Sequence, residues 1–293
     1  MSRFRFIQAE KACYPIALLC RALQVSRAGY YAWTRRGVST RAQADAVLTE
    51  QSRTIHQSSR GTYGAPRVPA ELQSSGQRVS RKRVARLMPA AAVRGCSRRR
   101  QRVCTTVTDP TATAAPNLVA RSFEASRPTE LWVGDITYLP TDEGWLYLAT
   151  LLDAYSRRIV GWAMADHLRT ELALDALTMA LQQRRPPPGQ LVHHTDRGCQ
   201  YTARAYQAVL AAHGVTCSMS RAGDCYDNAL AESFFGTLKA ELVQGQRWPS
   251  RRAARLAVFE WLEVFYNRQR RHSALAYLSP VSFEAGLTAS LVA

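Results

Sequence analysis

The chain of 293 residues is 46% hydrophobic and 21% charged, which is typical of a globular protein with one large or two smaller domains. No apolar run approaches the roughly 18–20 residues that span a bilayer, and no signal-peptide core follows Met1. The 7 cysteines form no Cys-x-x-Cys pair, which argues against a zinc knuckle or a disulfide framework. We therefore expect a cytoplasmic protein with no membrane partner.

The net charge of +17 is concentrated in the first part of the chain. Residues 1–120 carry 21 Lys and Arg against 5 Asp and Glu, whereas residues 121–293 carry 18 against 17. Arginine dominates the basic part, and its guanidinium suits bidentate contact with phosphate, so this part is predicted to bind nucleic acid. The alternative is a basic surface that only keeps the protein soluble.

The segment 14–36 predicts two short helices joined by a turn. Ile16, Leu19 and Leu23 recur at helical spacing, and Ser26 is a suitable N-cap for a second helix that carries three aromatic residues. This is a helix-turn-helix pattern, whose second helix could enter a major groove of DNA. Any small helical bundle would show the same pattern.

A polar helix at 41–57 and a glycine-containing turn precede a second two-helix unit. Its last helix is predicted to begin after Ser80, with Val84 and Leu87 facing inward. Pro69, in the helix before it, fits only near a first turn. Four cations within six residues point outward and predict contact with phosphates, namely Arg81, Lys82, Arg83 and Arg86.

Residues 94–116 combine a basic cluster with Thr, Ala and Pro in no periodic order, which is typical of a linker. We expect the cluster to lie along DNA, and it contains Arg98, Arg99, Arg100 and Arg102. This division predicts a helical DNA-binding region at 1–93, a basic linker at 94–124, and a third region at 125–286.

The third region has three closely spaced strand-like runs, at 131–139, 145–152 and 158–165. After them come a helix, a strand at 191–194, a second helix, a strand at 215–219 and two closing helices. This order predicts an α/β fold with a mixed five-stranded sheet flanked by helices, the arrangement of ribonuclease-H-like nucleases.

Three carboxylates stand in matching contexts in this region. Asp135 lies within the first strand, Asp196 follows the fourth, and Glu232 lies in a helix expected to pack over the same sheet edge. Converging carboxylates can hold two hard divalent cations for chemistry at a phosphodiester. Lys239 lies two helical turns after Glu232, so we expect it on the same face and in contact with phosphate.

The alternative is that the three acids are ordinary surface carboxylates. Asp153, which ends the second strand, is the strongest competitor for a catalytic role. His193 and His194 could ligate a metal, but carboxylate oxygen suits Mg²⁺ better, so we interpret at least one of them as a core or supporting histidine. Asp227 or Asn228 is predicted to cap the helix that carries Glu232.

Together these segments resemble the transposases of bacterial insertion sequences in the DDE class, specifically the product of the second reading frame. The resemblance runs over about 14–284 and depends on residues 26–33, 61–64, 79–83, 131–138, 194–201, 218–220, 225–235 and 266–275. It implies a core like that of retroviral integrases, with Asp135, Asp196 and Glu232 as catalytic residues and metal ligands. It further implies Mg²⁺, with Mn²⁺ as a substitute, and DNA contacts by Arg270 and Arg271 in the last motif.

The activity implied by the resemblance is cleavage at the ends of the element and joining of the freed 3′-hydroxyl to another phosphodiester. The implied partners are DNA (terminal inverted repeats and target), further copies of the chain in a multimer, and the upstream-frame product. The implied location is the bacterial nucleoid. Two alternatives remain: a non-catalytic DNA-binding regulator of transposition, and a nuclease acting on RNA–DNA hybrids.

Overall fold

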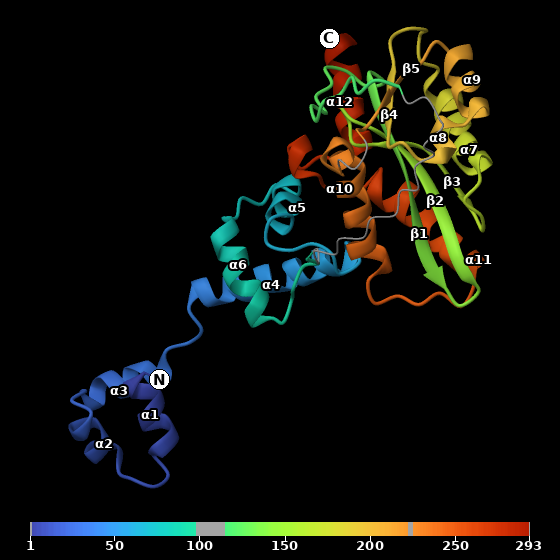
Figure 1. Cartoon of the computed structure of the whole chain (residues 1–293). Helices are drawn as coiled ribbons and strands as arrows, with labels where there is room; N and C mark the ends of the chain where they lie inside the picture. The colour runs from blue at the N-terminus through green and yellow to red at the C-terminus, as the bar shows by residue number, and fades with distance from the viewer. Residues whose placement is uncertain (1, 98–114, 222–224, 293) are drawn as a thin grey trace.

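A computed structural model describes residues 2–97, 115–221 and 225–292 of the chain (Figure 1). The helices before the sheet are α1 (Arg3–Glu10), α2 (Ile16–Ala22), α3 (Arg27–Arg35), α4 (Thr40–Ser58), α5 (Val68–Ser74) and α6 (Arg81–Ala90). The strands are β1 (Leu131–Thr141), β2 (Gly144–Asp153), β3 (Ile159–Ala165), β4 (Val192–Thr195) and β5 (Thr216–Met219).

The remaining helices lie between the strands or after them. They are α7 (Thr170–Arg184), α8 (Cys199–Thr202), α9 (Arg204–Ala212), η1 (Cys225–Asn228), α10 (Ala229–Leu238), η2 (Lys239–Val243), α11 (Arg251–Phe259), η3 (Glu260–Tyr266), η4 (Ser273–Leu275) and α12 (Pro280–Val292). None of the helices that the structure describes combines the length and the apolar character needed to span a bilayer.

Helices α1–α3 form a small bundle that stands apart from the other helices (Figure 1). Its core is a separate hydrophobic cluster built on Ile7, Leu19 and Tyr30. Ser26 caps α3 as predicted, because its Oγ accepts a hydrogen bond from the Gly29 amide at 2.9 Å. The two predicted helices are therefore present as α2 and α3, whereas α1 was not predicted.

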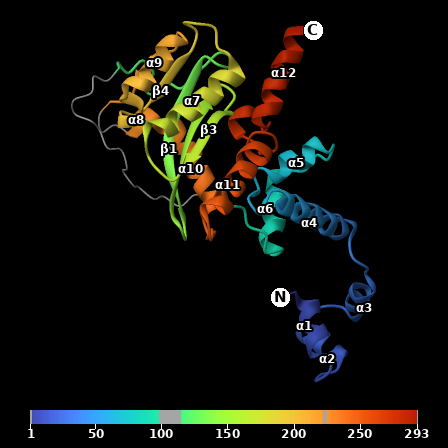
Figure 2. The ribbon, with the colours of Figure 1, turned by 90° about the vertical axis from the view of Figure 1, so that its right-hand side faces the viewer.

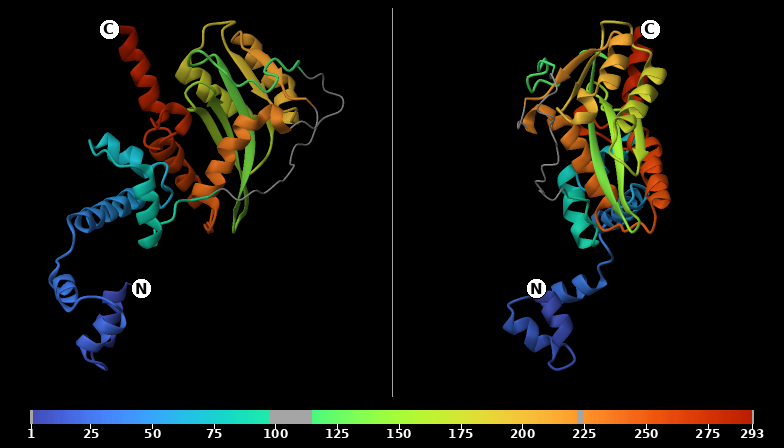
Figure 3. Two further views of the ribbon diagram at one scale, coloured as in Figure 1. Left: turned by 90° about the vertical axis from the view of Figure 1, so that its left-hand side faces the viewer. Right: turned by 45° about the vertical axis from the view of Figure 1, so that its right-hand side comes forward.

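Helices α4–α6 form a second helical unit, and this unit packs against the C-terminal helices. Val68 and Val84 belong to the same buried cluster as Trp261 and Phe265 of η3. Figures 2 and 3 show the helices after residue 225 lying between the sheet and α4–α6. Pro69 lies in the first turn of α5, where its missing N–H costs no helical hydrogen bond.

The five-stranded sheet has the order β3-β2-β1-β4-β5, so the predicted mixed sheet is confirmed. β1–β2 and β2–β3 are antiparallel, and β1–β4 and β4–β5 are parallel. Side chains of β2 alternate between the two faces: Leu148 and Leu152 join the cluster of α10, α11 and η3, whereas Ala149 and Leu151 join that of α7 and α9. Each face of the sheet is therefore covered by helices.

Three predictions about the closing helices need correction. The predicted single helix at 250–267 is α11 followed by the π-helical segment η3, and α12 was not predicted. Asn228 occupies the N-cap position of α10, but its side chain makes no capping hydrogen bond. Asp227 does not cap α10 either, since its carboxylate binds Arg221 and Asn117.

Candidate active site

The strand register brings two of the three predicted carboxylates to the same level of the sheet. Leu131 pairs with Val192 and Val133 with His194, so β1 and β4 are offset by 61 residues. Continued by two residues, the same offset places Asp135 opposite Asp196, where β4 has just ended. Val133 packs with Ala231 of α10, and the alternation along β1 directs Asp135 to this same side.

The electrostatics of Asp135 show that all three carboxylates act on one another. Asp135 is half-buried and accepts a hydrogen bond from the Ile136 amide at 2.7 Å. Burial raises its pKa well above the usual value, and the negative charges of Asp196 and Glu232 raise it further. Lys239 acts in the opposite direction and lowers this pKa.

Glu232 and Lys239 reach this region from one helical segment. Glu232 lies in the first turn of α10, and Lys239 begins the π-helical segment η2 that continues it. Both side chains are exposed. The Nζ atom of Lys239 lies 5.4 Å from the centre of the Tyr138 ring, a cation–π contact that holds the ammonium beside β1.

The two histidines before Asp196 are core residues. His193 is fully buried and its Nε2 lies 2.8 Å from the Tyr206 hydroxyl, and burial lowers its pKa to about 3. A Cβ at position 134 would lie 2.7 Å from Cε1 of His193, so only glycine fits beside Asp135 at this crossing of β1 and β4. The sequence interpretation of a core histidine therefore holds for His193.

His194 links the end of β4 to the start of the helix that carries Glu232. Its ring nitrogens lie 2.8 Å from Ser218 Oγ and 2.8 Å from the Asp227 carbonyl oxygen. Asp227 is buried, and its hydrogen bonds from Arg221 lower its pKa to about 2. Sequence reasoning missed this anchoring role of Asp227, although an acid just before a helix beside a nearby arginine was a usable signal.

Asp153, the competing carboxylate, has a structural role. It is fully buried and accepts hydrogen bonds from the backbone amides of Thr129, Tyr155 and Ser156 at 2.7–3.0 Å. These bonds engage both carboxylate oxygens and fix the turn between β2 and β3. The part of the chain that the structure describes contains no group of three or more His, Cys, Asp or Glu arranged to hold a metal ion.

Comparison with known proteins identifies the family. The integrase core domain matches at residues 125–225 and again at 213–280, and an HTH-like domain matches at 42–102. Transposase InsF for insertion sequence IS3A of Escherichia coli is 41% identical over 96% of this chain and 98% of its own length. The chain belongs to this family of insertion-sequence transposases.

Two further similarities are weaker or less informative about function. An uncharacterized 31 kDa protein of insertion element IS600 from Shigella sonnei is 44% identical to this transposase over 90% of the chain and 97% of the relative. The integrase catalytic core domain of HTLV-2, solved in complex with magnesium, is 16% identical, with a TM-score of 0.42 over 55% of this chain and 99% of that chain. The second likeness is too distant to carry an inference.

The predicted DNA-contact residues of the transposase fall into different environments. Arg81 and Lys82 are exposed on α6. Arg83 and Arg86 both bind the Asp45 carboxylate, at 2.6 and 2.7 Å, so each is partly neutralised within the protein. Arg98, Arg99 and Arg100 lie outside the described residues.

Arg270 and Arg271, which are also predicted to contact DNA, form ion pairs within the protein. The Arg270 side chain is only 6% exposed and forms two hydrogen bonds with Glu241, at 2.7 and 2.8 Å. Arg271 binds the Glu71 carboxylate and donates to Ser74 Oγ, and thereby joins α5 to the C-terminal segment. In a sequence, a cationic motif at the end of a helix suggests a DNA contact. Here its charges form ion pairs with carboxylates of the same chain.

Proposed function

We propose that Asp135, Asp196 and Glu232 form the catalytic site with which this transposase cleaves DNA at the ends of an insertion sequence and joins the 3′-hydroxyl to another phosphodiester. The observation that carries the proposal is the parallel register of β1 and β4, which continues to Asp135 and Asp196 on the face covered by α10. The raised pKa of Asp135 supports it, because after burial the negative charge of Asp196 is the next cause and Glu232 also contributes.

The described residues show no preformed group of three metal ligands, but carboxylate oxygens are the ligands that divalent ions of the magnesium type prefer, so we infer that binding of such ions draws the three acids together. The charges of Asp196 and Glu232 disfavour the ionised form of Asp135, and hard cations with oxygen ligands relieve such repulsion. When bound, Mg²⁺ or Mn²⁺ would activate the attacking oxygen and stabilise the leaving oxygen. Asp135 and Asp196 would hold the ions from two neighbouring strands, and Glu232 would complete the ligand set from α10.

The other residues of the site act on position and charge. Lys239, fixed beside Tyr138, would hold a phosphate next to the carboxylates. His194 and Asp227 keep the start of α10 against β4, so that Glu232 remains near the aspartates. Tyr201 is buried, and burial raises its pKa well above the usual value, which disfavours a nucleophilic phenolate.

We further propose that residues 1–93 recognise the terminal inverted repeats and that residues 125–286 carry out catalysis. Residues 94–124 would lie along the DNA and link these two regions. On α6, Arg81 and Lys82 are the exposed candidates for phosphate contact, with Arg83 and Arg86 beside them. Action on paired ends predicts a multimer, and the upstream-frame product would supply further end recognition. No observation favours a regulator without catalytic activity.

The test is a strand-transfer assay with the full chain on DNA that carries the inverted repeats flanking its gene, in Mg²⁺ and in EDTA, with and without the upstream-frame product. Asp135→Asn, Asp196→Asn and Glu232→Gln should each lower cleavage by at least about 10³-fold, roughly 4 kcal/mol of activation free energy, while DNA binding persists. The matched control is Glu171→Gln, an exposed glutamate in the first turn of α7 on the other sheet face. Cleavage by all three variants at the control rate would refute the assignment.

A further inference from the structure

A positively charged cavity of about 310 Å³ lies where α4–α6 meet the catalytic region. Its wall includes Arg67 before α5, Arg157 in the turn after β2, and Arg270 after η3. Ser233 and Thr237 of α10 form the opposite side. This volume is at the lower end of the range for ligand sites, enough for a phosphate group and its attached sugar oxygens.

Among the described residues, a single carboxylate forms ion pairs with the arginines in this wall. Glu241 is the carboxylate that faces Arg270 and Arg67, with its Oε1 at 2.7 Å from Arg270 and 3.5 Å from Arg67. The guanidinium of Arg157 has no ion pair with any residue that the structure describes. Arg67 and Arg270 thus share one carboxylate, and Arg157 has none of the described carboxylates within ion-pair distance, so an anion that enters the cavity would balance the excess of positive charge.

Neighbouring groups respond to this excess of positive charge. The pKa of His272 is lowered to about 2, by burial first and then by the charges of Arg270, Arg67 and Arg157. The pKa of Arg67 is lowered by burial and then by Arg270. The arginine charges add to the effect of burial in both shifts, whereas the pKa of Arg270 itself is raised, because its hydrogen bonds and charge interaction with Glu241 outweigh its burial.

The cavity and the proposed catalytic site lie on opposite flanks of α10. At about 100° per residue, Leu230, Ser233 and Thr237 share one side of the helix, and Glu232 lies on the other. Leu152, also in the cavity wall, pairs with Val133, two residues before Asp135 on β1. The two sites therefore share one face of the sheet and are separated by about one helix diameter, roughly 10 Å.

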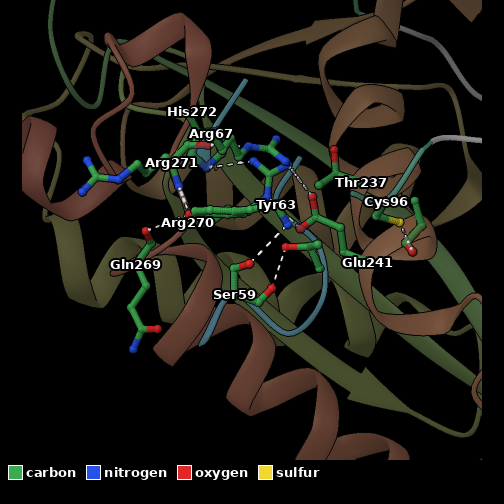
Figure 4. Close-up of polar contacts among 12 residues, drawn as sticks. Ser59, Tyr63, Arg67, Cys96, Thr237, Glu241, Gln269, Arg270, Arg271 and His272 are labelled. Carbon is green, nitrogen blue, oxygen red and sulfur yellow. Dashed lines mark hydrogen bonds and ion pairs between the residues drawn. The ribbon is translucent and has the colours of Figure 1, made fainter. Parts of the chain in front are cut away.

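The docking of the helical unit completes the cavity. Figure 4 shows Tyr63 and Arg67 meeting the segment from Gln269 to His272. The Arg271 amide donates to the Tyr63 hydroxyl at 2.8 Å, and Arg67 Nε donates to the Arg271 carbonyl at 3.1 Å. Arg67 thus enters the wall only because α4–α6 packs against the catalytic region.

We propose that this cavity is a phosphate subsite for a DNA strand, in which Arg157 and Arg67 hold one backbone phosphate about one helix diameter from the catalytic carboxylates. The proposal deepens the proposed function and rests on it for the identity of the ligand. DNA is favoured over a free anion because the cavity adjoins the helix that carries Glu232 and Lys239. The bound phosphate would also tie the helical unit to the catalytic region through Arg67.

The test uses the full chain in EDTA and two probes, inorganic phosphate and a random-sequence duplex with single-stranded tails. Arg157→Gln should weaken binding of the duplex roughly tenfold and reduce the slope of log affinity against log salt by about 0.7–0.9. It should also abolish the rise in Tm that sodium phosphate gives over sodium chloride at equal ionic strength. Arg157→Lys should retain most of both effects.

The matched control is Arg185→Gln. Arg185 is exposed and, like Arg157, has a positive φ (45° against 61°), but it ends α7 on the other face of the sheet. Unchanged DNA affinity and salt slope in Arg157→Gln would overturn the proposal. If the variant lost only the rise in Tm given by phosphate, the cavity would be a site for small anions and not for DNA.

A labelling experiment on the wild-type chain keeps the proposal testable if Arg157→Gln does not fold. DNA should protect Arg157 from phenylglyoxal and leave Arg185 reactive, as mapped by mass spectrometry. Equal labelling of Arg157 with and without DNA would overturn the subsite. Because these measurements need no metal, a chain that passes them but fails in strand transfer counts against the carboxylate assignment and not against the cavity.

Discussion

Removal of the Glu241 carboxylate is the sharpest test of the charge balance at the junction between the helical unit and the catalytic region. The Glu241 and Arg270 side chains are 5% and 6% exposed, and two hydrogen bonds join them. Glu241→Gln keeps the size of the side chain but leaves Arg270 and Arg67 facing each other without a counter-charge. Removing one partner of such a buried pair typically costs about 3–5 kcal/mol.

This cost is measurable as a change in unfolding. In urea, the free energy of unfolding of Glu241→Gln should fall by about 3–5 kcal/mol, and the Tm should fall by roughly 6–20 °C. Arg270→Gln in addition should restore part of the loss, with a coupling energy of about 2 kcal/mol. Inorganic phosphate should stabilise Glu241→Gln more than it stabilises the wild type, because the cavity has then lost its carboxylate.

Two results would refute this reasoning. A loss below about 1 kcal/mol in Glu241→Gln would mean that the pair is solvated or that Arg270 finds another partner. Strictly additive effects in the double variant would mean that the two charges do not interact. Glu263→Gln is a control within the same region, since Glu263 accepts a single hydrogen bond from Trp162 Nε1 at 2.8 Å.

Three further outcomes follow from the electrostatics. Because the pKa of Asp135 is raised in the folded state, its contribution to stability is full at low pH and is lost as the pH rises. Asp135→Asn should therefore raise the Tm of the metal-free chain at pH 7 and abolish strand transfer. The pKa values of His193 and His272 are lowered to about 3 and about 2. The stability that these neutral rings contribute is therefore complete above their unfolded pKa and falls as the pH drops below about 6.5. In urea titrations the slope should approach about 1.4 kcal/mol per pH unit for each histidine. Substitution of either histidine by Gln should reduce that slope, and an unchanged slope would count against its burial as a neutral ring. Asp227→Asn should cost about 1–3 kcal/mol in the same assay, because its carboxylate loses charge-assisted hydrogen bonds from the half-exposed Arg221, and should reduce strand transfer through the displaced start of α10.

Local pattern was sufficient for most of the elements and for the two aspartates. Alternating apolar residues marked β1 and β2, and a serine cap marked the starts of α3 and α6. The prediction that Asp135 and Asp196 belong to neighbouring strands followed from the order of the strands, and β1 and β4 do pair in parallel. These features depend on neighbours in the chain or on one strand pairing.

The features that could not be predicted depend on long-range packing. Val68 and Val84 look like the core of an independent helical unit, but they pack with Trp261 and Phe265. In the sequence, the arginine pair at 270–271 resembles a DNA contact. In the fold, Glu241 and Glu71, which lie on helices far away in sequence, form ion pairs with it. Sequence spacing carries no information on which carboxylate a given arginine will meet.

One helical segment connects the two charged regions of the molecule. α10 and η2 run without interruption from Glu232, through Lys239, to Glu241. A π-helical turn at 239–243 changes the rotation per residue, so that Lys239 faces β1 while Glu241 reaches Arg67 and Arg270. A helix moves as a unit. If α4–α6 shifted on DNA, Arg67 would move, its ion pair with Glu241 would move η2, and the position of Glu232 would change. The proposed catalytic site and the junction with α4–α6 are therefore held by the same continuous helical segment.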